Sequence, residues 1–281
     1  MQVPAWVCRT GTGDKAILQP GHWTDDTSMA LCLATSLVER NGFDPRDQIE
    51  RYSKWASSGY LSSTGSCFDI GGTVATALRC HRLTGAVYAG SQDPQSAGNG
   101  SIMRLAAVPM FYYPDIDAAE QYAADSSRTT HGAKECTDAC RLLARIICRA
   151  LNGCPKEEVL FRDRDSFMGA GKIVAIAKGV YQGKAASDIR GTGYVVESLE
   201  AAMWCFNVTD AFEEAILKAA NLGDDADTTA AVCGQVAGAY YGASGIPENW
   251  LERLAMRSEI TNLAHELSNN KSNSPVGCLV A

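Results

Sequence analysis

The chain has 281 residues, of which 46% are hydrophobic and 20% charged, and its formal net charge is −7 at pH 7. This is the balance of an ordinary globular protein. The negative charge and the lack of a Lys/Arg-rich stripe argue against nucleic acid as the main partner. No apolar run is long enough for a transmembrane helix and no signal peptide opens the sequence, so we expect a cytoplasmic protein.

The eleven cysteines are an odd number, and no two of them form a C-x-x-C pair. Several occupy apolar positions of helical patterns. This pattern favours buried, reduced thiols over a disulfide framework and agrees with a cytoplasmic location.

Apolar residues recur at three- and four-residue spacings along most of the sequence, and the alternation typical of strands is nearly absent. The breaks between periodic segments are Gly-rich or polar, and none is long enough to be an interdomain linker. We therefore predict an all-α fold, with one compact domain over residues 1–268. The predicted helices, in chain order, are 26–39, 45–57, 72–83, 102–111, 116–125, 133–151, 172–181, 195–206, 209–220, 227–241 and 248–268.

Residues 269–281 are rich in Ser and Asn, which predicts a flexible polar tail. The tail ends in Cys278, Leu279, Val280 and Ala281, which fit the C-a-a-X prenylation pattern. Short tails match this pattern by chance and no polybasic segment precedes it, so we favour an unmodified end.

Two adjacent carboxylates, Asp25 and Asp26, stand at the start of the first predicted helix between the hydroxyls of Thr24 and Thr27. An aspartate at a helix start is often only a cap, because its oxygen accepts an unpaired backbone N–H. Capping explains one carboxylate here, but it does not explain two that are flanked by hydroxyls.

A second acidic segment, with Asp224, Asp225 and Asp227 followed by Thr228, stands at the entry to the helix predicted at 227–241. Three carboxylates in four residues repel one another unless a cation is bound. Oxygen ligands favour Mg²⁺, Mn²⁺ or Ca²⁺ over zinc. Either segment alone is equally consistent with capping and surface charge, but the two together predict a two-metal site.

Three weaker segments lie between the acidic ones. The Gly-rich residues 97–104 lead into a predicted helix, which suits phosphate binding on backbone N–H groups but is also typical of an ordinary turn. Residues 126–132 collect hydroxyls around His131, although a lone histidine is more often structural. Asp69 stands beside Gly71 and Gly72, which is ambiguous alone.

Taken together, these segments resemble the ADP-ribosylglycohydrolase family, which includes the dinitrogenase reductase-activating glycohydrolases. The matching motifs run in order over nearly the whole chain and are WTDDTSM, CFDIGGT, GNGSIMR, TTHGAKE and NLGDDADTTAAVCGQVAGAYYG. The TDD and DxDT motifs at this separation are the specific part of the match. The resemblance implies an orthogonal all-α fold with two Mg²⁺ or Mn²⁺ ions. It also implies hydrolysis of the glycosidic bond between ADP-ribose and an acceptor, often an arginine side chain.

The resemblance also implies roles for individual residues, by motif position. The implied metal ligands are Thr24, Asp25, Asp26, Asp225, Asp227 and Thr228, with Asp224 as a neighbour. Asp69 and Asp26 are the implied catalytic carboxylates, one of them acting as general acid or base. The implied substrate-binding residues are Gly98, Asn99, Gly100, Ser101, Met103 and His131, with Gly193 and Tyr194 toward the adenosine. The expected partner is an ADP-ribosylated protein or a small ADP-ribose conjugate, and the acceptor stays open among arginine, serine, a nucleic-acid end and a metabolite.

The sequence departs from the family at its start. Family members usually open with a Gly-rich apolar helix that ends near a Val-Glu-Phe-like segment, whose Glu reaches the active site. Ala5 falls where that Glu is expected, so we expect an N-terminally short domain. This leaves a second interpretation open, an ADP-ribose-binding or structural protein of impaired activity. A two-metal phosphoesterase fits the carboxylates but not the sugar-directed motifs.

Overall fold

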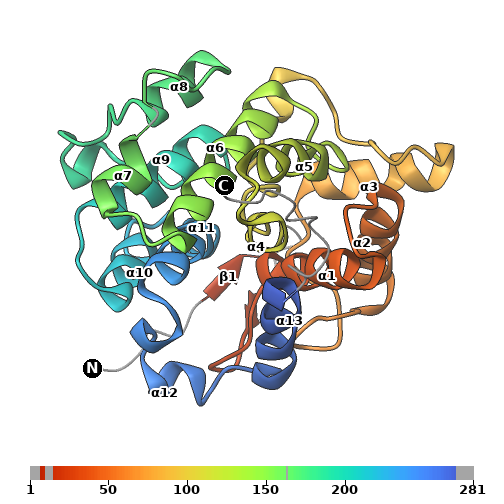
Figure 1. Cartoon of the computed structure of the whole chain (residues 1–281). Helices are drawn as coiled ribbons and strands as arrows, with labels where there is room; N and C mark the ends of the chain where they lie inside the picture. Colours follow the sequence, from red (N-terminus) through yellow and green to blue (C-terminus); the bar gives the residue numbers. More distant parts are fainter. Residues whose placement is uncertain (1–6, 10–14, 163, 270–281) are drawn as a thin grey trace, which may run out of the picture.

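Helices occupy most of the chain in the computed structural model, which describes residues 7–9, 15–162 and 164–269 (Figure 1). The predicted all-α fold is thereby confirmed. The α-helices are α1 (Asp25–Arg40), α2 (Pro45–Ser58), α3 (Gly72–Thr84), α4 (Ala107–Tyr112), α5 (Ile116–Arg128), α6 (Lys134–Leu151), α7 (Lys156–Phe161), α8 (Gly171–Ala177), α9 (Val195–Asn207), α10 (Phe212–Ala220), α11 (Ala226–Tyr241), α12 (Glu248–Leu251) and α13 (Arg257–Asn269). Short 3-10 helices span Pro94–Ser96, Ala186–Asp188 and Ala243–Gly245.

Local sequence signals set several of the helix ends. Asp44 caps α2 by accepting hydrogen bonds from the backbone N–H groups of Arg46 and Asp47, and Pro45 occupies the first helical position. The same helix ends at Gly59, which has a φ of 68°. These signals are why the helix predicted at 45–57 nearly coincides with α2.

Three predicted helices were too long. The segment predicted at 102–111 becomes helical only at Ala107, because residues 101–106 form successive turns. The segment predicted at 172–181 ends as a helix at Ala177, before a turn through Gly179 at a φ of 76°. The segment predicted at 248–268 is broken between α12 and α13, where the Ala255 N–H donates to the Gly21 carbonyl over 3.0 Å.

Besides the 3-10 helices, two features of the fold were not predicted. One is α7, a single short helix. The other is an antiparallel pair of three-residue strands, β1 (Val7–Arg9) and β2 (Lys15–Ile17), in which Val7 pairs with Ile17. From residue 270 onward the predicted tail, with its C-a-a-X ending, lies outside the residues that the structure describes. Ala5 lies outside them as well.

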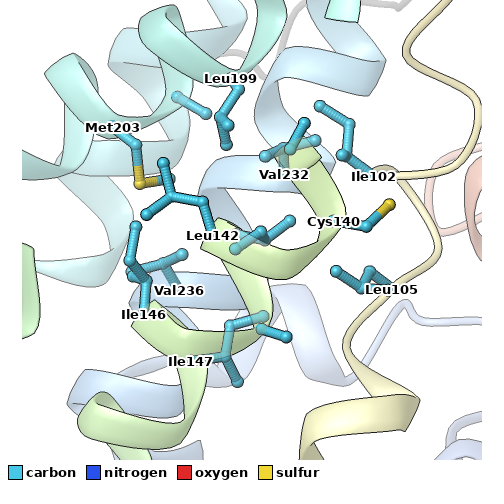
Figure 2. Close-up of a cluster of buried hydrophobic side chains, with 14 of the residues drawn as sticks. Ile102, Leu105, Cys140, Leu142, Ile146, Ile147, Leu199, Met203, Val232 and Val236 are labelled. Carbon is cyan, nitrogen blue, oxygen red and sulfur yellow. The ribbon is translucent and has the colours of Figure 1, made fainter. Parts of the chain in front are cut away.

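The main core lies where α6, α9 and α11 pack together (Figure 2). Its members include Leu142 and Ile146 of α6, Leu199 and Met203 of α9, and Val232 and Val236 of α11. Burying a side chain of this size stabilises the fold by about 1.5–3 kcal/mol. Small residues let α11 approach its neighbours closely, since a Cβ on Gly234 would lie 3.3 Å from Ile216 of α10.

A second apolar cluster joins α1, α2 and α3, and its members include Met29, Tyr52, Trp55 and Val74. These two cores position α1 and α11, which are in contact with each other. The acidic segments therefore meet although they stand about 200 residues apart in the sequence.

The cysteines agree with the prediction as far as the structure describes them. The nine cysteines whose side chains the structure describes are free thiols, and seven of these are buried. None of the described helices is apolar over a length that would cross a membrane.

Candidate active site

The start of α1 holds the first acidic segment in a buried position. Thr24, Asp25 and Asp26 are 7%, 8% and 3% exposed. Thr24 occupies the cap position, but its hydroxyl donates to the Asp26 carboxylate over 2.7 Å instead of capping the helix. Neither aspartate is thus accounted for as a helix cap of the usual kind.

The start of α11 presents the second acidic segment. Asp225 precedes the helix, and its backbone N–H donates to the Gly191 carbonyl over 2.8 Å. Asp227 and Thr228 follow in the first turn. Asp224 takes a left-handed conformation with a φ of 55°, and its carboxylate pairs with Arg190 over 2.7 Å. The Asp224 carboxylate is thus engaged by Arg190.

The acidic side chains act on one another electrostatically, which places them in one site. Burial, followed by the charges of Asp26, Asp69, Asp227 and Asp225, raises the pKa of Asp25 well above its usual value. We call these five aspartates the carboxylate cluster.

The pKa values of two other members of the carboxylate cluster move the same way. Burial, followed by the charge of Asp227, raises the pKa of Asp26 to about 8. Burial is also the main cause that raises the pKa of Asp225 to about 6. Since each group resists ionisation beside the others, a bound cation would stabilise the cluster.

The donor chemistry of the carboxylate cluster fits a hard divalent cation. All of its side-chain donors are oxygens, and the hydroxyls of Thr24 and Thr228 both act on Asp26. The Asp26 Oδ1 atom is buried and has no hydrogen-bond partner in the described part of the chain. However, no three His, Cys, Asp or Glu side chains among the described residues form a ready-made metal group. The residues therefore fit an ion in chemistry, although the carboxylates would have to draw closer to bind one.

Asp69 reaches the carboxylate cluster from the loop before α3. It adopts a φ of 59°, a left-handed conformation that is uncommon outside glycine and tends to occur at functional sites. Its charge acts on both Asp25 and Asp225, so it lies between the two acidic segments. Its side chain is half-buried.

The Gly-rich loop at residues 97–101 is fixed by the segment before α9. Gly98 pairs with Tyr194 in an isolated antiparallel bridge, and the Asn99 N–H donates to the Gly193 carbonyl over 3.0 Å. The Asn99 side chain then donates to the Asp225 carboxylate over 2.7 Å. Asn99 thus joins the loop to the carboxylate cluster, and the predicted substrate-binding residues adjoin the predicted metal ligands.

Only part of the Gly-rich loop has backbone N–H groups available to bind a phosphate. The N–H groups of Gly98 and Asn99 are bonded to carbonyls, whereas those of Gly100 and Ser101 make no hydrogen bond to any described residue. The side chains of Ser101 and Met103 are 2% and 5% exposed, so they are packed inside the protein. Contact of these two residues with a ligand would be through the backbone.

His131 lies directly beneath this loop. A Cβ on Gly100 would approach its ring to 2.8 Å at Cε1, and one on Gly98 would come within 3.4 Å of Nε2. Its Nδ1 atom is 2.8 Å from the Thr130 hydroxyl. Burial, reinforced by the charge of Arg104, lowers the pKa of His131 to about 3, so the ring is neutral at physiological pH.

A cavity of about 670 Å³ opens beside the same loop, lined in part by Thr73, Ser96, Gly98 and Gly193. Tyr194 borders it, and its hydroxyl donates to Glu135 and accepts from Lys172 over 2.9 Å. Sequence analysis predicted Gly193 and Tyr194 but gave Glu135 and Lys172 no role. Glu135 stands at the end of the TTHGAKE motif, whereas no local signal marks Lys172.

Comparison with known proteins shows the family and the fold of this chain. A family model described as ADP-ribosylglycohydrolase matches residues 2–275. The chain is 43% identical over 256 residues to "ADP-ribosylarginine hydrolase Tri1" of Pseudomonas putida (strain GB-1), covering 89% of this chain and 67% of that protein. It is 28% identical over 249 residues to "ADP-ribosyl-[dinitrogen reductase] glycohydrolase" of Rhodospirillum rubrum, covering 86% of this chain and 76% of that protein.

A solved structure titled "ADP-ribosylglycohydrolase-related protein complex" superimposes with a TM-score of 0.76 at 41% identity, covering 89% of this chain and 82% of that one. The chain is an all-α hydrolase and belongs to the ADP-ribosylglycohydrolase family. It is similar to the Tri1 hydrolases of Pseudomonas putida and of Serratia proteamaculans (strain 568), the latter at 42% identity over 250 residues, 89% of this chain and 68% of that protein.

Proposed function

We propose that this protein is a metal-dependent hydrolase that cleaves the glycosidic bond between ADP-ribose and an arginine side chain of a modified protein. The observation that carries the proposal is the meeting of two acidic segments at the starts of α1 and α11, joined by Asn99 to a Gly-rich loop. The similarity to relatives named as ADP-ribosylarginine hydrolases supports arginine as the acceptor.

The carboxylate cluster would hold two Mg²⁺ or Mn²⁺ ions through Thr24, Asp25, Asp26, Asp225, Asp227 and Thr228. The ions would supply Lewis-acid chemistry at the ribose and ionise the carboxylates that bind them. Because Asp25 and Asp26 are buried, their charges act in a low-dielectric environment, where they orient a bound sugar more strongly than they would in water.

The Gly-rich loop would bind the diphosphate of ADP-ribose. The N–H groups of Gly100 and Ser101 are available as donors to anionic oxygens, as the hydrogen bonds of the loop indicate. The adjoining cavity, bordered by Tyr194, would take the adenosine end. The reacting ribose would then lie toward Asn99 and the carboxylate cluster, on the other side of the loop.

Asp69 is the proposed general acid or base. Cleavage at the anomeric carbon passes through an oxocarbenium-like state, and the departing guanidine must take up a proton. Asp69 is the member of the carboxylate cluster that comes from a separate loop, and it is half-buried, which suits proton exchange with a substrate that enters from solvent. Asp26 is fully enclosed, so a role at the ribose side of the bond suits it better.

The test is release of free ADP-ribose from an arginine-ADP-ribosylated protein, measured with Mg²⁺ or Mn²⁺ and again with EDTA. We expect release only with metal, and a loss of about 100-fold or more in Asp227→Asn. The matched control is Asp224→Asn, which lies in the same segment but pairs with Arg190, and it should keep its activity. Release from a serine-linked substrate alone would contradict the assignment to arginine. Phosphate release from ADP-ribose would favour a phosphoesterase, and tight binding without cleavage would favour a binding protein.

A further inference from the structure

Arg104 is a buried cation in the turns between the Gly-rich loop and α4. It is 1% exposed, and it forms no ion pair with any residue in the described part of the chain. Its guanidinium lies over the Tyr52 ring at 4.5 Å from the centroid. Burying a charge without a counter-charge is costly, so a buried arginine of this kind needs an explanation beyond packing.

The hydrogen bonds of Arg104 lead to the Gly-rich loop and to Thr130. One terminal nitrogen donates to the Gly100 carbonyl over 2.9 Å, and the other donates to the Thr130 hydroxyl oxygen over 2.7 Å. A guanidinium has only donors, so in the second bond the Thr130 oxygen must be the acceptor. The proton of the Thr130 hydroxyl is then left for another partner.

That partner is His131, whose Nδ1 atom lies 2.8 Å from the Thr130 oxygen. Thr130 is 0% exposed, so a hydroxyl proton directed elsewhere would be buried without an acceptor, at a cost of about 1–3 kcal/mol. Thr130 therefore donates to Nδ1. Because the His131 ring is neutral, its single proton must be on Nε2.

The Nε2 atom faces the underside of the Gly-rich loop. A Cβ would lie 3.1 Å from it at Gly100 and 3.4 Å at Gly98, while neither glycine has a positive φ. Gly100 is therefore required for space above the histidine ring rather than for backbone conformation, whereas a Cβ on Gly98 would make an ordinary van der Waals contact with the ring. Nε2 makes no hydrogen bond to any other described residue, so its proton is available to a ligand on the loop.

We propose that Thr130, oriented by Arg104, is a positioning residue that fixes His131 with its proton on Nε2, so that His131 donates to an anionic oxygen bound on the Gly98–Gly100 loop. The oxygen would belong to the diphosphate of ADP-ribose, and this inference rests on the proposed function. Three donors would then be available to the ligand, since the N–H groups of Gly100 and Ser101 have no other partner among the described residues.

The first test is the tautomer of His131 in the unliganded wild-type protein, measured by ¹⁵N NMR on histidine-labelled protein. His131→Gln assigns the signal among the four histidines. We expect a protonated Nε2 and an unprotonated Nδ1. A proton on Nδ1 overturns the proposal, whether or not the protein hydrolyses any substrate.

The second test compares Thr130→Val with Thr130→Ser, which removes or keeps the hydroxyl. For Thr130→Val we expect ADP-ribose binding, measured by calorimetry, to weaken about tenfold, and the Nδ1 signal to show partial protonation. Thr130→Ser should stay within about twofold of wild type. Equal affinity of both variants for ADP-ribose overturns the proposal. If Thr130→Val does not fold, the His131 tautomer of the wild-type protein decides whether the proposal holds. Failure to release ADP-ribose from arginine with these results intact would refute the proposed function and leave this inference standing.

Discussion

Replacement of Asp26 by Asn should stabilise the metal-free protein while it abolishes the response to metal. The folded protein raises the pKa of Asp26 from 3.8 to about 8. Between these values the folded state binds a proton that the unfolded state has lost, so the stability of the wild type falls as the pH rises from about 4 to about 8. An asparagine has no such pH dependence, and its oxygen can still accept the hydrogen bond from Thr24.

The magnitude follows from the pKa shift. About four pKa units at 1.36 kcal/mol each set an upper limit of roughly 5 kcal/mol at pH 8. Small movements that admit water would relieve part of the repulsion, so we expect a gain of about 2–3 kcal/mol, or a rise of about 5 °C in Tm. The gain should disappear below about pH 4, where the carboxyl is protonated in both states.

The assay is thermal unfolding in EDTA from pH 4 to pH 8.5, repeated with Mn²⁺. Mn²⁺ should raise the Tm of the wild type by mass action and leave the Tm of Asp26→Asn nearly unchanged. The variant should therefore have the higher Tm in EDTA and the wild type the higher Tm with Mn²⁺. Asp224→Asn is the control, because that carboxylate pairs with Arg190 outside the cluster and should leave the metal response intact. An Asp26→Asn variant that is less stable than wild type at pH 8 in EDTA would refute the reasoning.

Three further changes test the neighbouring groups. Asn99→Ala removes the 2.7 Å bond that lowers the pKa of Asp225, so Mn²⁺ should bind about tenfold more weakly near pH 6.5 by calorimetry; an unchanged affinity would count against the link. Gly100→Ala places a Cβ 2.8 Å from the His131 ring and should weaken ADP-ribose binding by tenfold or more, whereas Gly183→Ala, which has open space, should not; equal effects would contradict the close approach. The pKa of His131 falls from 6.5 to about 3 on folding, so stability should be lost as the pH falls through this range, at up to about 1.4 kcal/mol per pH unit. The free energy of unfolding in urea, measured at pH 4.5 and 6.5, should fall more in wild type than in His131→Gln as the pH is lowered. An equal fall in both proteins would exclude a buried neutral ring.

Local chemistry in the sequence indicated the two acidic segments, and the structure brings them together. Asp25 and Asp26 were identified because two adjacent carboxylates at the start of an apolar helix exceed what capping needs. The expectation that Asp224 differs from Asp225 rested on family resemblance alone. In the structure Asp224 has a left-handed backbone and its carboxylate pairs with Arg190.

Long-range contacts account for what the sequence did not reveal. Arg104 falls in a predicted helix, where an arginine is usually at the surface, yet it is buried because residues 101–106 are turns that bring it to Gly100 and Thr130. The pairing of Gly98 with Tyr194 joins segments about 100 residues apart. The C-terminal helix is broken where Ala255 bonds to Gly21, a partner more than 200 residues away.

The central claim is that the acidic segments of α1 and α11 form one binuclear metal centre. The most direct measurement is anomalous scattering from crystals grown with Mn²⁺. The account predicts two Mn²⁺ ions between the starts of these helices, with ligands from both Asp25–Asp26 and Asp225–Asp227. Ions held by one segment only, or bound elsewhere while the cluster stays empty at saturating Mn²⁺, would contradict it.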